Sequence, residues 1–244
     1  MSEKEVSRSE RDSDASSKKV EEEILAGTYQ TGLMPELSHP VYRFAKRAFD
    51  IAFSGAVIAV AAVPSLALCL AIRLESPGSP IYSHVRLGRI GKDGTLKTFR
   101  MYKFRSMYAD ADERLSELLD KNEVEGAMFK MKDDPRVTRV GRFIRKHSID
   151  EFPQFLNVLL GQMSVVGPRP PLVREIPDYS ASDLRRLTVK PGLTGPWQVS
   201  GRSDLDFEDM VKLDLDYIER RGLFHDLGLI CKTVKVVFTG EGAA

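Results

Sequence analysis

A run of 22 residues without a charged side chain, residues 51–72, constrains the fold of this chain more than any other feature. Its charged flanks are Arg43, Lys46, Arg47 and Asp50 before it and Arg73 after it. A helix needs about 20 predominantly apolar residues to cross a bilayer, and this run has that length. The run starts too far from Met1 to be a cleaved signal peptide. We therefore expect a membrane-associated protein.

Pro64 lies inside the run, so we do not expect one straight helix. Proline lacks a backbone donor, and its ring clashes with the carbonyl four residues earlier, here that of Val60. A helix over residues 51–63 would be about 20 Å long, shorter than a hydrocarbon core of about 30 Å. Three basic residues precede the run and four follow it closely, which gives no preferred orientation. These features favour a re-entrant helix-break-helix over residues 39–74, with a proline-kinked membrane span as the alternative.

The segments on either side of this helix differ in composition. Residues 1–38 are rich in Glu, Lys, Ser, Arg and Asp and have few large apolar side chains, so they predict a disordered charged tail. Residues 75–244 contain no second run of spanning length. We expect them to form a cytoplasmic domain at the membrane interface.

The pattern within residues 75–244 predicts a mixed α/β fold with more helix than strand. Two short β-like pieces, residues 81–85 and 96–102, are separated by glycines that mark turns. Helical patterns follow at residues 110–119 and 152–163. The expected domain therefore begins with short strands and continues mainly as helices.

A last apolar stripe lies within residues 227–238 and has helical spacing. Lys232 and Lys235 are placed on its polar side. This arrangement fits an amphipathic helix that lies on an anionic membrane surface, and it fits an ordinary core-facing helix equally well.

The charge balance and the cysteine count exclude several classes of protein. A net charge of +1 argues against nucleic-acid binding through bulk charge. The two cysteines, Cys69 and Cys231, provide neither a disulfide framework nor a usual zinc site, and they fit a reducing, cytoplasm-facing location. The four histidines include no pair at helical i,i+4 spacing. Any metal is therefore expected to have oxygen ligands.

Asp150 and Glu151 lie side by side where a helix is expected to begin. The structural interpretation is a capping box, in which Ser148 and Glu151 satisfy the first backbone donors. The surrounding arginines are Arg136, Arg139, Arg142, Arg145 and Arg169. Arginine suits phosphate oxygens, and Mg²⁺ is typically held by one or two carboxylates together with substrate phosphates. The pair therefore indicates an anionic, metal-bound substrate, while the first three arginines also fit a solvated or lipid-facing stripe.

Several segments together resemble the bacterial sugar transferase family, the monotopic polyprenyl-phosphate phosphoglycosyl transferases of envelope polysaccharide and glycoconjugate assembly. The segments are Lys46-Arg47-Ala48-Phe49-Asp50, Tyr102-Lys103-Phe104-Arg105-Ser106-Met107, residues 148–154, residues 157–164, Val166-Gly167-Pro168-Arg169-Pro170, residues 190–195, Gln198-Val199 and Gly201-Arg202. They follow the family's order over about residues 41–244. The set is specific, whereas no single segment would suffice.

The resemblance implies roles for individual residues. Asp150 would be the catalytic nucleophile and a Mg²⁺ ligand, and Glu151 would assist the metal or a proton transfer. Arg145, five residues before the nucleophile, corresponds to a phosphate contact. Arg169 lies in a turn that matches a region implicated in binding the nucleotide.

Two further implications concern the basic motif and the membrane helix. Lys103 and Arg105 belong to a motif near the family's active site, so both are expected to bind substrate. Family members break their re-entrant helix at a Ser-Pro pair, whereas this sequence has Val63-Pro64-Ser65. The proline supports the break and the residue before it does not.

The implied reaction transfers a sugar-1-phosphate from a UDP-sugar to polyprenyl (undecaprenyl) phosphate and releases UMP. Asp150 would form a covalent aspartyl phosphosugar that the lipid phosphate then attacks. The expected location is the cytoplasmic face of the bacterial inner membrane, at the first membrane step of polysaccharide or glycoconjugate synthesis. The expected partners are the UDP-sugar, the lipid and the membrane, without nucleic acid. The sequence specifies neither the sugar nor whether the chain forms a homo-oligomer.

Two other functions stay open. A conventional metal-dependent glycosyltransferase would use an Asp-x-Asp motif and release UDP. This pattern occurs four times, at residues 12–14, 110–112, 204–206 and 214–216, so it is a weak signal. A non-catalytic membrane-anchored assembly protein would keep the acidic pair only as a helix cap.

Overall fold

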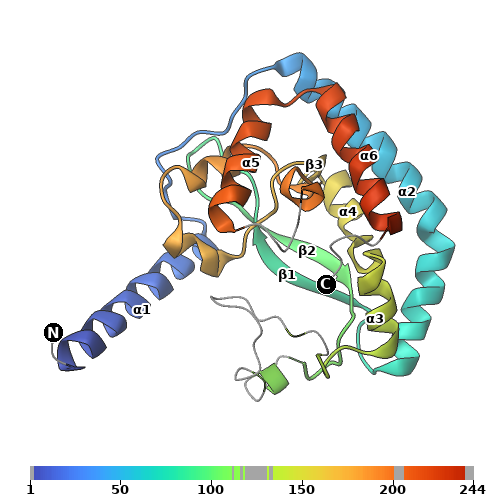
Figure 1. The fold of residues 1–244 in the computed structure, drawn as a ribbon, viewed down its shortest axis with the longest axis horizontal. Coiled ribbons are helices and arrows are strands. Elements are labelled where there is room, and N and C mark those ends of the chain that lie inside the picture. Colours follow the sequence, from blue (N-terminus) through green and yellow to red (C-terminus); the bar gives the residue numbers. More distant parts are fainter. Residues whose placement is uncertain are drawn as a thin grey trace.

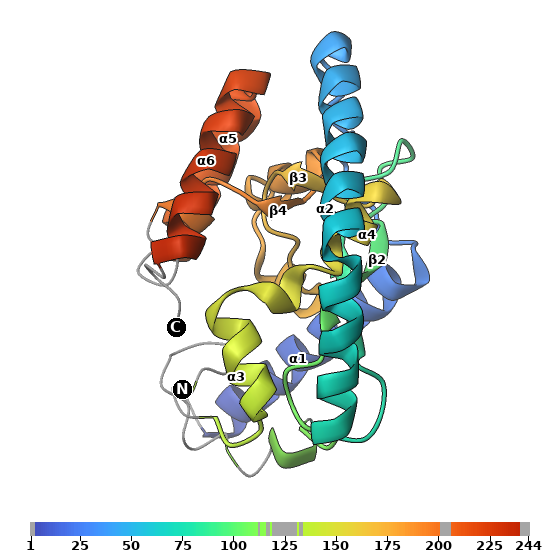
Figure 2. The same cartoon turned by 90° about the vertical axis from the view of Figure 1, so that its right-hand side faces the viewer.

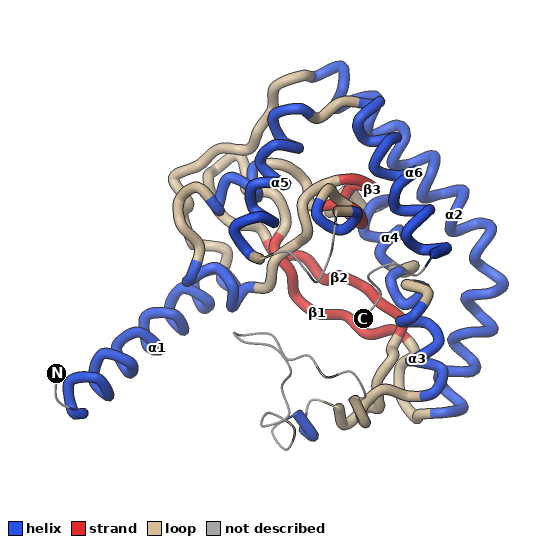
Figure 3. Tube along the Cα trace, viewed as in Figure 1, coloured by secondary structure: helices blue, strands red, loops and turns tan. Residues whose placement is uncertain are grey.

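The computed structural model describes residues 3–111, 113–115, 118, 131, 134–200 and 206–239. Helices outweigh strands in these residues, as the mixed α/β prediction has it (Figures 1 and 3). The main elements are α1 (Glu3–Ala26), α2 (Pro40–Glu75), β1 (Ile81–Leu87), β2 (Thr98–Phe104), α3 (Arg139–Lys146), α4 (Gln154–Leu159), β3 (Ser164–Val166), β4 (Gly192–Thr194), α5 (Phe207–Arg220) and α6 (Leu223–Thr239). Short 3-10 helices connect them, among them η1 (Glu113–Leu115), η3 (Ile149–Glu151), η4 (Val173–Asp178) and η5 (Asp183–Thr188).

Helix α2 contains the whole uncharged run within 36 residues. It is long and apolar enough to cross a membrane, by length and composition, and no other helix of the described residues is. Pro64 lies inside it, and the helix bends part-way along its length (Figure 1). The expected break thus takes the form of a bend within one helix, because proline removes one hydrogen bond while the turns on either side keep theirs.

The N-terminal part of α2 is joined to the rest of the molecule by polar contacts. The ammonium of Lys46 donates to Asp226 of α6 over 2.6 Å. The guanidinium of Arg47 donates to the carbonyls of Val158 and Leu159, at 2.6 and 2.7 Å. These carbonyls end helix α4, where a cation also complements the helix dipole. This end of α2 is therefore attached to α6 and to α4, which lies beside it in Figure 2.

The C-terminal end of α2 is joined to the same body through α3 and β2. The Glu75 carboxylate accepts from the backbone nitrogens of Arg139 and Val140, at 2.7 and 2.9 Å, so it caps the first turn of α3. Arg105, the residue after β2, donates to the carbonyls of Ser76 and Pro77, which follow the helix. The polar residues before the uncharged run and those after it therefore contact the same body of the protein.

Strands β1 and β2 lie where the two β-like pieces are expected, and they pair as an antiparallel hairpin. Strand β1 ends two residues later than expected, and β2 is shifted by two residues along the chain. The side chain of Asn157 in α4, which is fully buried, lies against the outer edge of β2. Its Oδ1 accepts from the nitrogen of Tyr102 at 3.1 Å, and its Nδ2 donates to the carbonyl of Arg100 at 2.7 Å. Asn157 therefore fixes α4, the helix after the acidic pair, to the hairpin.

Strands β3 and β4 pair in parallel and bring two glycine-containing motifs together. A Cβ atom on Gly192 would lie 2.1 Å from the nitrogen of Gly167, a distance that no side chain tolerates. The close approach of these two backbones therefore requires glycine at both positions. It also holds Pro168, the residue before Arg169, next to β4, where the Gly192 nitrogen donates to the carbonyl of Pro168 at 2.8 Å.

Helix α1 occupies residues for which the composition predicts a disordered tail. It extends away from the body in Figure 1 and docks at its C-terminal end. Ile24 is fully buried against Leu87 and Leu96, and Val20, one turn earlier, packs on the same cluster. Burial of Val20 and Ile24 against the body stabilises α1, whose polar composition alone would not keep it helical. The chain before α2 is thus helical over this range, which corrects the predicted disorder.

The other predicted helices differ in extent. Of residues 110–119, the described part contains only η1, and residues 112, 116, 117, 119 and 120 lie outside the description. The pattern over residues 152–163 becomes the shorter α4, because Gly161 adopts a positive φ of 78° and ends the helical path. The pattern over residues 227–238 lies within α6, where the side chains of Val237 and Phe238 are outside the described set.

Candidate active site

The acidic pair lies in η3, between α3 and α4. Ser148, just before it, has a positive φ of 54°, and its side chain forms no capping hydrogen bond. The capping-box interpretation therefore does not describe this turn. Ser148 is one of two non-glycine residues with positive φ in the described chain, a conformation that is uncommon and often found at functional sites.

Lys103 of β2 faces both carboxylates. Its ammonium lies 2.7 Å from Glu151 Oε1 and 3.7 Å from Asp150 Oδ2. Burial raises the pKa of the Asp150 carboxyl, the Lys103 charge lowers it, the neighbouring Glu151 raises it, and Arg145 lowers it. The net pKa lies above the ordinary value, so the carboxylate form of Asp150 depends on nearby cations.

A second group of polar residues lies close to Lys103. His84 Nε2 accepts from Arg86 Nε at 2.5 Å on the same face of strand β1. Burial, followed by the charges of Arg86, Lys103 and Arg169, lowers the pKa of His84 to about 4. His84 is therefore neutral near pH 7, and the three cations around it create a positive field beside the acidic pair.

Arg169 and Arg86 meet at the turn after β3. Arg86 is buried and donates to the carbonyl of Pro170 at 3.1 Å. Arg169 lies 3.5 Å from Glu175 of η4 and is half-buried. Burial and then Arg169 lower the pKa of Arg86 to about 10, so the two guanidinium groups feel each other. This turn therefore adds positive charge to the site, partly balanced by Glu175.

Sequence reasoning missed His84, Arg86 and Glu175. The first two share a strand at a spacing of two residues, and this alternation would have placed them on one face. Their distance from Asp150 in the sequence, more than 60 residues, hides the connection. Glu175 has no comparable signal.

The expected substrate-binding arginines occupy different surroundings. Arg145 is exposed in the last turn of α3, close enough to act on the pKa of Asp150. Arg105 is buried, and its guanidinium is directed at the carbonyls that end α2 rather than at the acidic pair. The structure therefore places Lys103 and Arg145 near the acidic pair. Arg105 instead connects the end of β2 to the segment that follows α2. Among the three arginines that also fit a solvated or lipid-facing stripe, Arg136 is buried in an ion pair with Asp134. Arg136 is therefore not part of an exposed stripe.

The donor set at the acidic pair fits a divalent cation that completes its shell elsewhere. No group of three or more His, Cys, Asp or Glu side chains that could hold a metal occurs among the described residues. Asp150 and Glu151 offer two adjacent carboxylates, and Mg²⁺ commonly combines one or two carboxylates with water and substrate phosphates. The residues present are thus compatible with the expected Mg²⁺.

The Asp-x-Asp pair in α5 does not form a comparable site. Asp214 is fully buried in an ion pair with Arg186 at 2.6 Å, whereas Asp216 is exposed and lies 2.8 Å from Arg220. The two carboxylates point to different surroundings, as two residues separated by two positions on a helix must. The pairs at residues 110–112 and 204–206 fall partly outside the described residues, and the side chains of residues 12–14 fall outside them too.

Comparison with known proteins decides the family. Residues 41–240 match the family described as bacterial sugar transferases, which is most of the chain. The chain belongs to the bacterial sugar transferase family. The resemblance inferred from the sequence motifs is therefore confirmed.

Three relatives illustrate the match of this bacterial sugar transferase. It is 48% identical over 201 residues to galactosyl transferase CpsE of Streptococcus agalactiae, covering 82% of this chain and 43% of that protein. It is 45% identical over 206 residues to undecaprenyl-phosphate galactose phosphotransferase of Salmonella typhimurium, covering 82% and 42%. It is 37% identical over 208 residues to exopolysaccharide production protein ExoY of Rhizobium meliloti, covering 84% and 90%. The chain thus spans less than half the length of the first two relatives and most of the third.

Motif segments of this bacterial sugar transferase that are far apart in the sequence meet in space. Asp50, at the end of the Lys46–Asp50 motif, is buried in α2, and its Oδ1 accepts from Ser164 Oγ and from the nitrogen of Val165, both at 3.0 Å. The first motif is thereby bound to β3, which leads into the turn with Arg169. Gly201 and Arg202 lie outside the described residues.

Proposed function

We propose that the chain transfers a sugar-1-phosphate from a UDP-sugar to polyprenyl phosphate, releases UMP and forms polyprenyl-diphospho-sugar. The observation that carries the proposal is the buried Asp150 carboxylate beside Glu151, with Lys103 within 3.7 Å and a bent apolar helix in the same body. Family membership supports the same reaction class, because relatives are named undecaprenyl-phosphate sugar phosphotransferases.

In the first step, a carboxylate oxygen of Asp150 attacks the phosphorus next to the sugar. The bond between this phosphorus and the UMP oxygen breaks, and UMP leaves with the electron pair. Lys103 and Arg145 favour the carboxylate form of Asp150 and offer positive charge to the diphosphate. The product of this step is an aspartyl phosphosugar.

In the second step, an oxygen of polyprenyl phosphate attacks the same phosphorus. The bond to Asp150 breaks, and the free carboxylate is restored. The positive field of Arg86, Arg169 and Lys103 suits the phosphates that enter and leave in both steps. A Mg²⁺ ion held by Asp150 and Glu151, when bound, would neutralise part of the diphosphate charge.

The contacts at the two ends of α2 support a re-entrant or surface-lying helix over a membrane span. From Arg47 to Arg73, a straight helix would extend about 39 Å, enough to separate its ends across a hydrocarbon core. Arg47 and Glu75, however, both bind backbone groups of the same body. A span would place one of these polar attachments on the far side of the membrane, so we propose that both ends of α2 stay on the cytoplasmic side of the bacterial inner membrane.

Exposed apolar side chains mark the surface that would contact lipid. On α2 they are Val60, Val63, Leu66, Leu70 and Leu74; on α4 and its C-cap they are Leu156 and Leu160, and on α6 they are Phe224, Leu227 and Val234. Helix α6 buries Leu229 on its other side, so it has an apolar face left over for a membrane. Apolar surface of this extent in contact with water is costly, and contact with lipid removes that cost.

Nucleotide release tests the proposed reaction. The purified protein in nanodiscs would be given Mg²⁺, polyprenyl phosphate and a panel of UDP-sugars. UDP-galactose comes first, because relatives from Streptococcus, Salmonella and Erwinia have galactose or galactosyl in their names. We expect UMP release, lost in Asp150→Asn and retained in Asp216→Asn, an exposed aspartate of the rival Asp-x-Asp pair. Release of UDP, or full activity of Asp150→Asn, would rule the mechanism out.

A further inference from the structure

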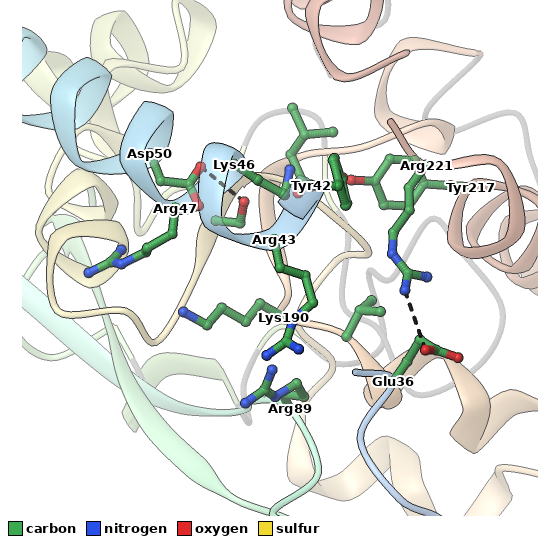
Figure 4. Close-up of a pocket in the computed structure, with 13 residues that line it drawn as sticks. Glu36, Tyr42, Arg43, Lys46, Arg47, Asp50, Arg89, Lys190, Tyr217 and Arg221 are labelled. Carbon is green, nitrogen blue, oxygen red and sulfur yellow. Dashed lines mark hydrogen bonds and ion pairs between the residues drawn. The ribbon is translucent and has the colours of Figure 1, made fainter. Parts of the chain in front are cut away.

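A cavity of about 240 Å³ lies under the N-terminal turns of α2 (Figure 4), and the residues that line it come from other parts of the sequence than the acidic pair. Its lining includes Arg43 and Arg47 of α2, Arg89 from the segment after β1, and Lys190 just before β4. We call this set the basic pocket. Neither carboxylate of the acidic pair, nor Lys103, lines it.

Some of the charges around this cavity are already balanced. Lys46, which also lines it, is paired with Asp226 at 2.6 Å, and Arg221 lies 3.7 Å from Glu36. Asp50 also lines the cavity, but its Oδ1 accepts two hydrogen bonds from residues of β3. These groups therefore leave little negative charge for the basic pocket.

The remaining cations lack such partners. The side chains of Arg89 and Lys190 form no hydrogen bond and no ion pair with any residue that the structure describes. Arg43 and Arg47 donate to backbone carbonyls, which carry no net charge. Four cations thus line one cavity without an ion-paired carboxylate of their own.

Their mutual repulsion is visible in the electrostatics and in the arrangement. Burial and then Arg43 lower the pKa of Arg89. Burial, Arg47 and Arg89 lower the pKa of Lys190, and the charge of Asp50 offsets only part of that shift. In Figure 4 the guanidinium ends of Arg43 and Arg89 face each other, and the Lys190 side chain extends between them and Arg47. Partly buried like charges destabilise a fold unless an anion joins them.

We propose that the basic pocket binds a phosphate group, at a site separate from the acidic pair. Two guanidinium forks and an ammonium suit the oxygens of a phosphate better than any single carboxylate. The phosphate comes from an anionic phospholipid or from a soluble phosphate compound. The lipid source fits the position of the pocket, since Arg47 lies only four residues before the uncharged run that is expected to meet the membrane.

Thermal unfolding of the full chain in detergent micelles tests this proposal and separates the two sources. The added probes are phosphatidylglycerol, phosphatidylcholine and inorganic phosphate, each over a concentration series. The variant is Arg89→Gln/Lys190→Gln, and the matched control is Arg185→Gln/Lys212→Gln, which removes one exposed arginine and one exposed lysine elsewhere. The Tm of the wild type and of the control is expected to rise with one of the phosphate probes. The pocket variant is expected to bind that probe with at most a tenth of the wild-type affinity.

The outcomes are distinguishable. A rise with phosphatidylglycerol that the pocket variant loses supports a lipid headgroup; a rise with inorganic phosphate alone, lost in the same variant, supports a soluble ligand. No rise in wild type with any probe, or an equal rise in the pocket variant, overturns the proposal. Without added anion, the pocket variant should be at least as stable as wild type, because two repelling charges are gone. Arg89→Lys/Lys190→Arg keeps both charges and should keep binding, which guards against a folding defect as the explanation.

Discussion

Asp150 combines two properties that oppose each other. Its burial disfavours the charged form, while the attack on phosphorus that we propose requires that form. Lys103 and Arg145 reduce the conflict by lowering the pKa of Asp150. Lys103 has the larger effect of the two, and its ammonium lies 3.7 Å from the Asp150 carboxylate. The readiness of the nucleophile therefore depends on a residue 47 positions earlier in the chain.

Replacing Lys103 with Met should shift the acid limb of activity. Since Lys103 lowers the pKa of Asp150, its loss should raise that pKa, so kcat/KM begins to rise only at a higher pH than in wild type. At neutral pH we expect a loss of about 10²-fold, the usual effect of removing one electrostatic contact in an active site. The pH profile of kcat/KM measures both effects. Lys103→Arg keeps the charge and should move the limb less, whereas an unshifted limb in Lys103→Met would disprove this role.

At the scale of elements, Glu75 links the end of the apolar helix α2 to α3, the helix that carries Arg145. Its two carboxylate oxygens bind the first backbone nitrogens of α3. Burial alone would raise the pKa of Glu75, but the hydrogen bonds from Val140 and Arg139 outweigh it and lower the pKa below 4.5. The position of α3, and with it that of Arg145, depends on this cap.

Glu75→Gln should lower the stability of the protein by about 1 kcal/mol, the usual value of a charged helix cap. Because the folded pKa is lowered, the contribution of the carboxylate is complete above the ordinary pKa of 4.5 and disappears as the pH falls through the folded value. Denaturation in detergent at pH 7 and at pH 3 to 4 should therefore show a difference from wild type that shrinks in acid. Glu219→Gln, an exposed glutamate on α5, is the control. A difference that grows in acid would contradict the assignment.

Helix α1 is a second element whose role can be tested, with adjacent residues as test and control. Ile24 is fully buried and Leu25 is 56% exposed. Ile24→Ala should cost about 2 to 4 kcal/mol, because a buried side chain is truncated. Leu25→Ala should change the free energy of unfolding by about 0.5 kcal/mol or less. Equal effects in chemical denaturation would mean that α1 does not dock as the structure has it.

For the whole molecule, the attachment of both ends of α2 to one body predicts where its flanks lie in a cell. In a protein whose native cysteines are replaced (Cys69→Ser, Cys231→Ser), single cysteines would be introduced as Ser38→Cys and Ser79→Cys, both at exposed sites. A membrane-impermeant maleimide should label neither cysteine in intact spheroplasts and both after lysis. Labelling of either one before lysis would show that α2 crosses the membrane.

Much of this architecture could be predicted from local patterns. The β-like residues 81–85 and 96–102, with glycines between them, indicate two strands, and the uncharged run with Pro64 indicates an apolar helix interrupted at the proline. The acidic pair was recognised through motifs spread over the chain. The first two signals each lie within a short stretch of sequence, where composition and periodicity are informative.

The remainder depends on contacts between distant segments. Arg105 was expected to bind substrate, but its partners are backbone carbonyls after α2, which have no signature in the sequence. His84 joins the site only through the register of the hairpin. The docking of α1 depends on Val20 and Ile24, an i,i+4 pair whose signal is lost in the strongly polar composition around it. In each case the partner, not the residue itself, determines the role.

The buried side chain of Asn157 also has a consequence for assembly. A two-stranded sheet leaves the outer edge of β2 with unpaired backbone groups, and such an edge readily pairs with a strand of another molecule. Asn157 bonds the nitrogen of Tyr102 and the carbonyl of Arg100 on that edge, and so takes the place of one residue of a third strand. The hairpin that presents Lys103 is thereby protected against strand exchange with a second copy, a safeguard against aggregation provided by one amide.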